Sequence, residues 1–122
     1  MPIVDVTIVA GRDEKVAAGL TQALADAVGR ALDSPPGQTW VRLHLLPQDC
    51  YAENHAAPGS TDLPVFVVVL NRKIPDQPQL AETIARLTQA IAEATGRPSD
   101  SVHIEHAPSA CGRVAFGGQL VQ

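Results

Sequence analysis

Aromatic residues are scarce in this chain, which has one tryptophan, one tyrosine and two phenylalanines among 122 residues. Basic residues are also few: the formal net charge is −4, and no lysine- or arginine-rich stripe is present. Proteins that bind nucleic acid usually carry such a basic stripe, often with aromatic side chains on which bases stack. These shortages argue against a nucleic-acid partner.

Long apolar runs and cysteine clusters are lacking as well. No run approaches the ~20 apolar residues that span a bilayer, and the first segment has no basic stretch typical of a signal peptide, so we expect a cytoplasmic protein without a membrane partner. Cys50 and Cys111 make neither a zinc ligand set nor a redox motif and are expected to be free thiols. His103 and Glu105 share one face of an expected strand and His106 takes the other, which disfavours a metal site. We expect no metal and no cofactor.

What the chain does contain is an internal repeat. Pro2 opens an apolar strand at 3–9, which is followed by a turn with Arg12, a helical pattern and a second strand at 40–46. Pro64 opens the same series: a strand at 65–70, a turn with Arg72, a helical pattern and a strand at 101–106. Repeats of this length built as β-α-β units indicate duplication of one supersecondary element.

The duplication predicts the fold class and the domain organisation. We expect an α/β (α+β) protein in which two β-α-β repeats form a four-stranded mixed sheet with two helices on one face. Residues 1–122 then form a single domain, with repeat one at 2–47, a linker at 48–63 and repeat two at 64–122. The strand at 65–70 is apolar at every position, as expected of a central strand covered on both faces. A second subunit is the expected cover of the face that the helices leave open.

The helices are predicted from apolar residues that recur at helical spacing. The first stripe consists of Val16, Leu20, Leu24, Val28 and Leu32, and Asp13 is its expected N-cap. The second stripe consists of Leu80, Ile84, Leu87 and Ile91. Asp76 and Gln79 have capping-box spacing before this second helix, and Gly96 is placed to end it.

Pro2 is the most informative single residue. It follows Met1 directly, so removal of Met1 would leave a secondary amine on a rigid ring, which is a candidate catalytic base that needs no side chain. The plain alternative is a proline that only begins a strand, where its missing N–H costs little.

Proton transfer along a conjugated enol also needs a cation that holds an anionic carboxylate. An α-amino group has a pKa near ~8, and a neighbouring guanidinium or an apolar pocket would lower this pKa toward neutrality. Arginine suits the anchor, because its planar fork binds a carboxylate through two parallel hydrogen bonds and keeps its proton. The candidate anchors are Arg12, Arg42, Arg72 and Arg113.

Segments in both halves of the chain resemble the 4-oxalocrotonate tautomerases. The segment 1–4 (Met-Pro-Ile-Val) followed by 10–15 (Ala-Gly-Arg-Asp-Glu-Lys) is similar to the opening of that family, and 98–104 with 111–120 look like its last strand and its glycine-rich hairpin. The length is that of a fused member carrying both units. The resemblance implies a homotrimer and a tautomerase, an isomerase acting on small 2-hydroxydienoate or α-keto acid substrates.

The resemblance also implies roles for single residues. Pro2 would be the general acid/base, Arg72 would lie near it as the first anchor, and Arg42 would reach a site in an adjacent subunit. Arg12 is the pseudo-symmetric partner of Arg72 and could instead lie near Pro64, whose nitrogen is locked in an amide. Further candidates for substrate binding are Arg113, Tyr51 and Phe116, and either Tyr51 or Glu53, in the loop before Pro64, could assist catalysis.

Two other functions stay open. Addition of water, as by a hydratase or dehalogenase, would need a protonated Pro2 and a carboxylate that activates water. A catalytically silent ligand-binding protein on the same scaffold would result if Met1 is retained. Decarboxylation is disfavoured, because 35–39 (Pro-Pro-Gly-Gln-Thr) has no carboxylate where the decarboxylase branch carries one and 73–75 (Lys-Ile-Pro) replaces its second arginine.

Overall fold

The structure is a computed structural model that describes residues 2–57 and 63–122. Both repeats contribute to one four-stranded sheet with the strand order β2-β1-β3-β4. β1 is parallel to β2 and antiparallel to β3, and β3 is parallel to β4, so the predicted mixed sheet is confirmed. The elements are β1 (Ile3–Ala10), α1 (Leu20–Ala31), β2 (Trp40–Pro47), β3 (Val65–Leu70), α2 (Gln79–Thr95), β4 (Val102–His106), β5 (Ala115–Phe116) and β6 (Gln119–Leu120). Residues 58–62 of the expected linker lie outside the described residues.

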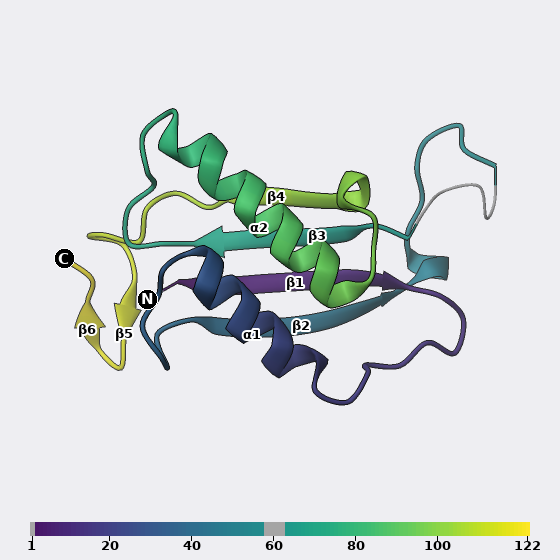
Figure 1. The fold of residues 1–122 in the computed structure, drawn as a ribbon, viewed down its shortest axis with the longest axis horizontal. Helices are drawn as coiled ribbons and strands as arrows, with labels where there is room; N and C mark the ends of the chain where they lie inside the picture. The colour runs from purple at the N-terminus through teal and green to yellow at the C-terminus, as the bar shows by residue number, and fades with distance from the viewer. Residues whose placement is uncertain (1, 58–62) are drawn as a thin grey trace.

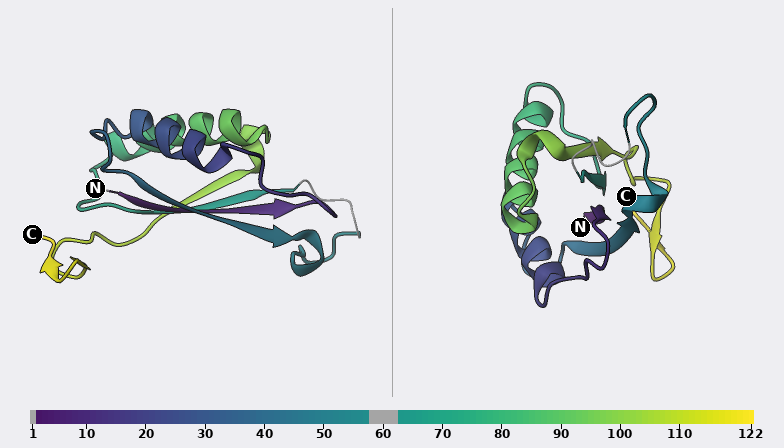
Figure 2. Two further views of the ribbon diagram at one scale, coloured as in Figure 1. Left: turned by 90° about the horizontal axis from the view of Figure 1, so that it is seen from below. Right: turned by 90° about the vertical axis from the view of Figure 1, so that its right-hand side faces the viewer.

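The molecule has two layers and a projecting hairpin. Both helices lie on one face of the sheet, as predicted (Figure 1). The β5–β6 hairpin lies beyond the edge of the sheet at the end where β1 begins, on the side away from the helices (Figure 2). The start of the chain and the hairpin are therefore close together at one end of the sheet, and the segment that follows β2 is at the other.

The core lies between the sheet and the two helices. Alternate strand residues point into it, among them Val4, Val6 and Ile8 on β1 and Val65, Val67 and Val69 on β3. The helices supply Leu24, Val28, Leu87 and Ile91, which are fully buried. Each such side chain contributes about 1.5–3 kcal/mol by leaving water. This burial fixes the register of the strands, because a shift by one residue would exchange the two faces.

The opposite face of the sheet is open in the single chain, and we call it the open face. It is apolar along β3, where Phe66, Val68 and Leu70 alternate with the core residues. By strand alternation, the flanking strands carry polar side chains there, namely Asp5, Thr7, Arg42, His44, His103 and Glu105, and also the apolar pairs Ile3–Trp40 and Val9–Leu46. The open face is therefore apolar along β3 and at both ends of the β1–β2 pair, and polar between those ends.

Helix α1 begins later than the apolar spacing predicts. Asp13, the expected N-cap, lies in a turn with a φ of 65°, and Val16 is 47% exposed outside the helix. The residue before the helix is Gly19, with a φ of 80° and no side-chain cap. A left-handed backbone at this position interrupts the helical path and suits glycine. The N-cap prediction for Asp13 is therefore wrong.

Helix α2 follows the prediction more closely. Leu87 and Ile91 of the predicted stripe are buried, and Gly96 ends the helix with a φ of 70°. The predicted capping box does not form, because the main-chain oxygen of Asp76, not its side chain, accepts the N–H of Leu80, at 3.0 Å.

Neither described helix has the length and apolar character needed to cross a membrane. Cys50 and Cys111 are free thiols. Within 2–57 and 63–122, His, Cys, Asp and Glu side chains form no group of three that could hold a metal ion.

Candidate active site

Pro2 is buried at the start of β1, next to the first residue of β2. Its carbonyl oxygen accepts the N–H of Trp40, with an N–O distance of 3.0 Å. On the other side of β1, Ile3 pairs with Leu70, the last residue of β3. The antiparallel register therefore brings Arg72, two residues past Leu70, to the end of the sheet where Pro2 lies. Met1 lies outside the described residues.

Aromatic rings stand at this end of the sheet. The ring of Trp40 meets that of Phe116, from β5, edge to face with centroids 5.2 Å apart, an arrangement that aromatic pairs favour. Trp40 is 47% exposed in the single chain. The hairpin thus places Phe116, a predicted site residue, against Trp40. Trp40 is a neighbour of Pro2 and was not among the predicted site residues.

Arg72 and Arg113 are both partly engaged by main-chain oxygens. The Nε–H of Arg72 donates to the main-chain oxygen of Gln122, and its own carbonyl accepts the N–H of Cys111 at 3.1 Å. Arg113 donates to Ser109 O at 2.9 Å and to Pro108 O at 2.8 Å. Within the described part of the chain, one of the five N–H donors of Arg72 has a partner and the others remain for a ligand, whereas Arg113 mainly holds the segment after β4 in place.

Arg42 lies on the open face and is bound by a carboxylate of its own chain. It pairs with Asp5 across β1 and β2, with its Nε 2.6 Å from Oδ1 and its Nη2 2.8 Å from Oδ2. These hydrogen bonds raise the pKa of Arg42 above its ordinary value. Asp5 is three residues from Pro2 along β1, or about 10 Å at ~3.3 Å per residue.

Arg12 lies at the opposite end of the sheet from Pro2. It follows the last residues of β1, where the N–H of Val9 donates to the carbonyl oxygen of Pro64 at 3.0 Å. The eight steps from Pro2 to Ala10 along a strand span about 26 Å, at ~3.3 Å per step. Within one chain, Arg12 therefore lies near Pro64 rather than Pro2, as the repeat allows.

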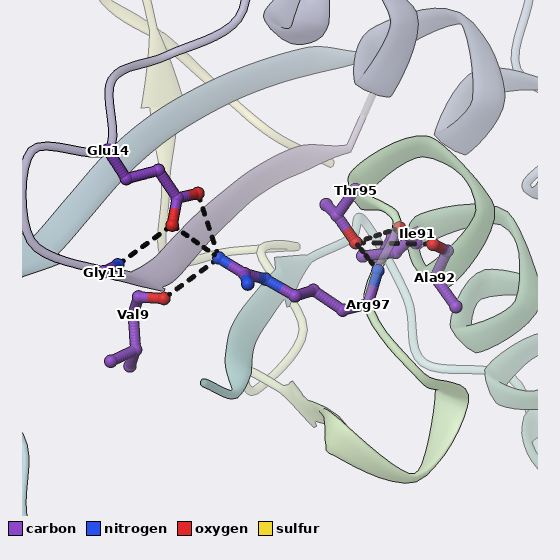
Figure 3. A network of polar contacts seen from close by, with 7 residues as sticks. All are labelled: Val9, Gly11, Glu14, Ile91, Ala92, Thr95 and Arg97. Atoms are coloured by element: carbon purple, nitrogen blue, oxygen red, sulfur yellow. Dashed lines mark hydrogen bonds and ion pairs between the residues drawn. The ribbon is translucent and has the colours of Figure 1, made fainter. Parts of the chain in front are cut away.

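A polar network holds the turn that carries Arg12 (Figure 3). The Nη2 of Arg97 donates to Val9 O at 3.1 Å and to both carboxylate oxygens of Glu14, at 3.2 and 3.0 Å. The same carboxylate accepts the N–H of Gly11 at 2.9 Å. The bond from Gly11, together with those from Arg97, lowers the pKa of Glu14. This network explains why the chain turns at 11–14 instead of starting the helix there.

Tyr51 also lies far from Pro2 within the chain. Its hydroxyl donates to Glu53 Oε2 at 2.7 Å, which raises the pKa of Tyr51. Its ring is 5.8 Å from that of Phe66, which in turn is 5.5 Å from His103. Since Phe66 pairs with Thr7, this cluster lies on the open face toward the end of β1.

Three further residues were not predicted as site residues: Trp40, Asp5 and His106. In the sequence, the Asp5–Arg42 pair was indicated by two residues of opposite charge at outward-facing positions of the two expected strands of repeat one. His106 lies on the helix side of β4, and both its ring nitrogens are buried with no hydrogen-bond partner among the described residues. Burial lowers the pKa of His106.

Comparison with known proteins identifies the fold. No protein-family model and no curated protein sequence matches the chain. A structure of Pt0534 inactivated by 2-oxo-3-pentynoate superposes with a TM-score of 0.75 at 21% identity, over 98% of this chain and 94% of that one. Native fused 4-OT gives 0.74 at 22% identity, over 98% and 95%. A macrophage migration inhibitory factor homologue from Prochlorococcus marinus gives 0.70 at 16% identity, over 98% and 99%. The chain has the tautomerase fold.

Proposed function

We propose that this protein is a tautomerase that moves a proton in small 2-hydroxydienoate or α-keto acid substrates, with Pro2, freed from Met1, as the general acid/base. The observation that carries the proposal is the position of Pro2. It heads an interior strand of a tautomerase fold, and the antiparallel β1–β3 register brings Arg72 to the same end of the sheet.

The chemistry needs only one group that accepts and returns a proton. The nitrogen of Pro2 takes the hydroxyl proton of the enol, and the oxygen's electron pair forms the carbonyl. The carbon end of the conjugated system then takes the proton back from Pro2. The guanidinium of Arg72 and the burial of Pro2 both disfavour the protonated amine, which brings its pKa below the ordinary value near ~8.

The arginines supply the binding of the substrate's carboxylate and carbonyl oxygens. Arg72 serves the Pro2 of its own chain through the donors that Gln122 leaves free. Arg42 serves the site of a neighbouring subunit. It faces away from the helices, and it lies at the level of Asp5, about 10 Å along the sheet from its own Pro2. Two fused 4-OT structures are described as a symmetric and an asymmetric trimer, and we propose a trimer here.

The remaining predicted residues have supporting roles. Phe116, with Trp40, would shield the reacting atoms from water, and Arg113 would hold the segment before the hairpin in place. Arg12 and Tyr51 lie at the far end of the sheet and could contact substrate only in a site completed by another subunit.

Asp5 is a poor candidate for the carboxylate that water addition requires. A hydratase or dehalogenase needs a carboxylate that is free to take a proton from water. Asp5 is the carboxylate on β1 itself, and both of its oxygens accept hydrogen bonds from Arg42.

The test uses processed protein, with removal of Met1 verified by intact mass. Pro2→Ala should reduce enol-to-keto turnover by ~10²-fold or more, the usual loss for a positioned proton carrier, while the assembly stays intact. In a second measurement, 2-oxo-3-pentynoate, an acetylenic α-keto acid, should add to the secondary amine and appear as one adduct on the Pro2 peptide. Unchanged turnover in Pro2→Ala would refute the proposal.

A further inference from the structure

The Asp5–Arg42 pair has a geometry that suggests more than a surface ion pair. Asp5 binds the side edge of the guanidinium, through Nε and Nη2 at 2.6 and 2.8 Å. An arginine has five N–H donors in a planar fork. Asp5 uses two of them, so both N–H groups of Nη1 and one of Nη2 remain. The remaining N–H of Nη2 and one N–H of Nη1 form the end edge of the fork, which can itself bind a carboxylate bidentately.

We propose that Asp5 is a positioning residue, which holds the guanidinium of Arg42 side-on so that its end edge faces an incoming substrate carboxylate. The inference rests on the proposed function, in which Arg42 is an anchor. Asp5 does not touch the substrate and acts only through Arg42.

Exposure explains why such a residue is useful here. The side chain of Arg42 is 63% exposed and that of Asp5 is 33% exposed. Exposed ion pairs usually contribute little to stability, so the pair is poorly explained as a stabilising contact. A long, exposed arginine otherwise occupies many rotamers, and a ligand that fixes it must overcome that entropy. Asp5 removes this cost before the substrate arrives.

Asp5 could also have the opposite effect on the binding of a substrate carboxylate, and experiment can distinguish the two effects. Asp5 carries a negative charge close to the expected position of the substrate carboxylate, so it could instead compete for Arg42. In that case, removing the charge would tighten the binding of a carboxylate ligand. If Asp5 positions Arg42, removing the charge weakens binding.

The experiment measures binding of adipate, a saturated dicarboxylate that cannot tautomerise, by calorimetry with the processed full-length protein. Asp5→Asn should raise the dissociation constant of adipate about three- to tenfold, the range expected when one long side chain must be ordered on binding. Asp5→Glu keeps the charge and should restore part of the affinity. Glu105→Gln removes one negative charge from the same sheet face and should leave the dissociation constant unchanged. In an Arg42→Ala background, Asp5→Asn should have no further effect.

The possible outcomes separate this inference from the proposed function. If Arg42→Ala weakens binding but Asp5→Asn leaves it unchanged or tightens it, the positioning role is wrong while Arg42 remains an anchor. If Arg42→Ala leaves adipate binding unchanged, both the anchor and the positioning role fall. Turnover tests the proposed function independently, through Pro2. In an active enzyme, Asp5→Asn should raise KM and leave kcat nearly unchanged, as expected for binding that is equal in the ground and transition states.

Discussion

At the scale of single residues, the two proposed anchors differ in what already binds them. Arg42 is held side-on by a carboxylate of its own chain. Arg72 gives one N–H to a main-chain oxygen of Gln122, and no Asp or Glu side chain is seen to bind it within the described residues. The other N–H groups of Arg72 are therefore available to a ligand at the Pro2 end.

We expect Arg72→Ala to lower kcat/KM for carboxylate-bearing substrates by about 10²-fold. A buried anion left without its cation costs a few kcal/mol, and each 1.4 kcal/mol is a factor of ~10. Steady-state kinetics on processed protein measure the effect. Arg12→Ala is the matched control, because Arg12 occupies the equivalent turn of repeat one at the far end of the sheet. Loss of activity in Arg12→Ala with normal activity in Arg72→Ala would show that the two repeats are assigned to the wrong sites.

His106 should make stability depend on pH. Burial lowers the pKa of His106 in the folded protein, and both ring nitrogens lack a partner. The unfolded chain therefore binds the proton on His106 more tightly than the folded chain does. The contribution of neutral His106 to stability is fully present above the unfolded pKa of about 6.5 and is lost as the pH falls through the lower folded pKa. Chemical denaturation at pH 7.5 and 5.5 measures the loss. We expect His106→Leu to reduce the difference between the two pH values; an unchanged difference would assign the acid sensitivity to other groups.

At the scale of elements, two glycines in equivalent helices have opposite roles. Gly96 ends α2 with a φ of 70°, and a Cβ added there meets no atom within 4 Å. Any cost of a side chain at Gly96 is therefore conformational. Gly29 lies inside α1, and a Cβ there would make an ordinary contact with Thr39 Oγ1, at 3.6 Å.

We expect Gly96→Ala to lower the free energy of unfolding by about 1 kcal/mol, because an alanine is disfavoured in the left-handed region. Gly29→Ala should raise it by up to about 1 kcal/mol, because alanine favours the helix interior over glycine. Urea denaturation of the two variants measures both changes. Equal effects of the same sign would contradict the assignment of Gly96 as the C-cap.

At the scale of the whole molecule, the open face makes assembly a condition of the proposed activity. Phe66 is 38% exposed there and lies in one apolar row with Val68 and Leu70 along β3, and exposed apolar surface of this kind usually marks an interaction site. Arg42 lies on the same face and is proposed to serve a neighbour. A cyclic trimer would bury the β3 portion of the face and complete the site from two chains.

Light scattering should therefore give about three times the 12.8 kDa mass of the chain. Because the proposed sites are shared, specific activity should fall when the protein is diluted below the dissociation constant of the assembly. Phe66→Lys is expected to dissociate the trimer, because it would place a charge in the buried interface. A monomer that retains full activity would show that the shared-site model is wrong.

The local pattern of the sequence determined the elements and their arrangement in two repeats. The repeat predicted two β-α-β units, and the apolar run at 65–70 became an interior strand whose alternate residues Val65, Val67 and Val69 are buried in the core. Gly96 marked a helix end correctly, since a left-handed cap strongly favours glycine. These features depend on the spacing of residues within one element, which a single sequence carries.

Only the tertiary structure decided which residues meet. The start of α1 lies at Leu20, after the left-handed Gly19, rather than at Asp13, and Arg97, more than eighty residues away, binds Glu14 in the turn that Asp13 occupies. The Asp5–Arg42 pair arises from the strand register, and the strand direction separates Arg12 from Pro2 by the length of β1. Such contacts join distant segments, and their geometry is fixed by packing of the whole core rather than by any local preference.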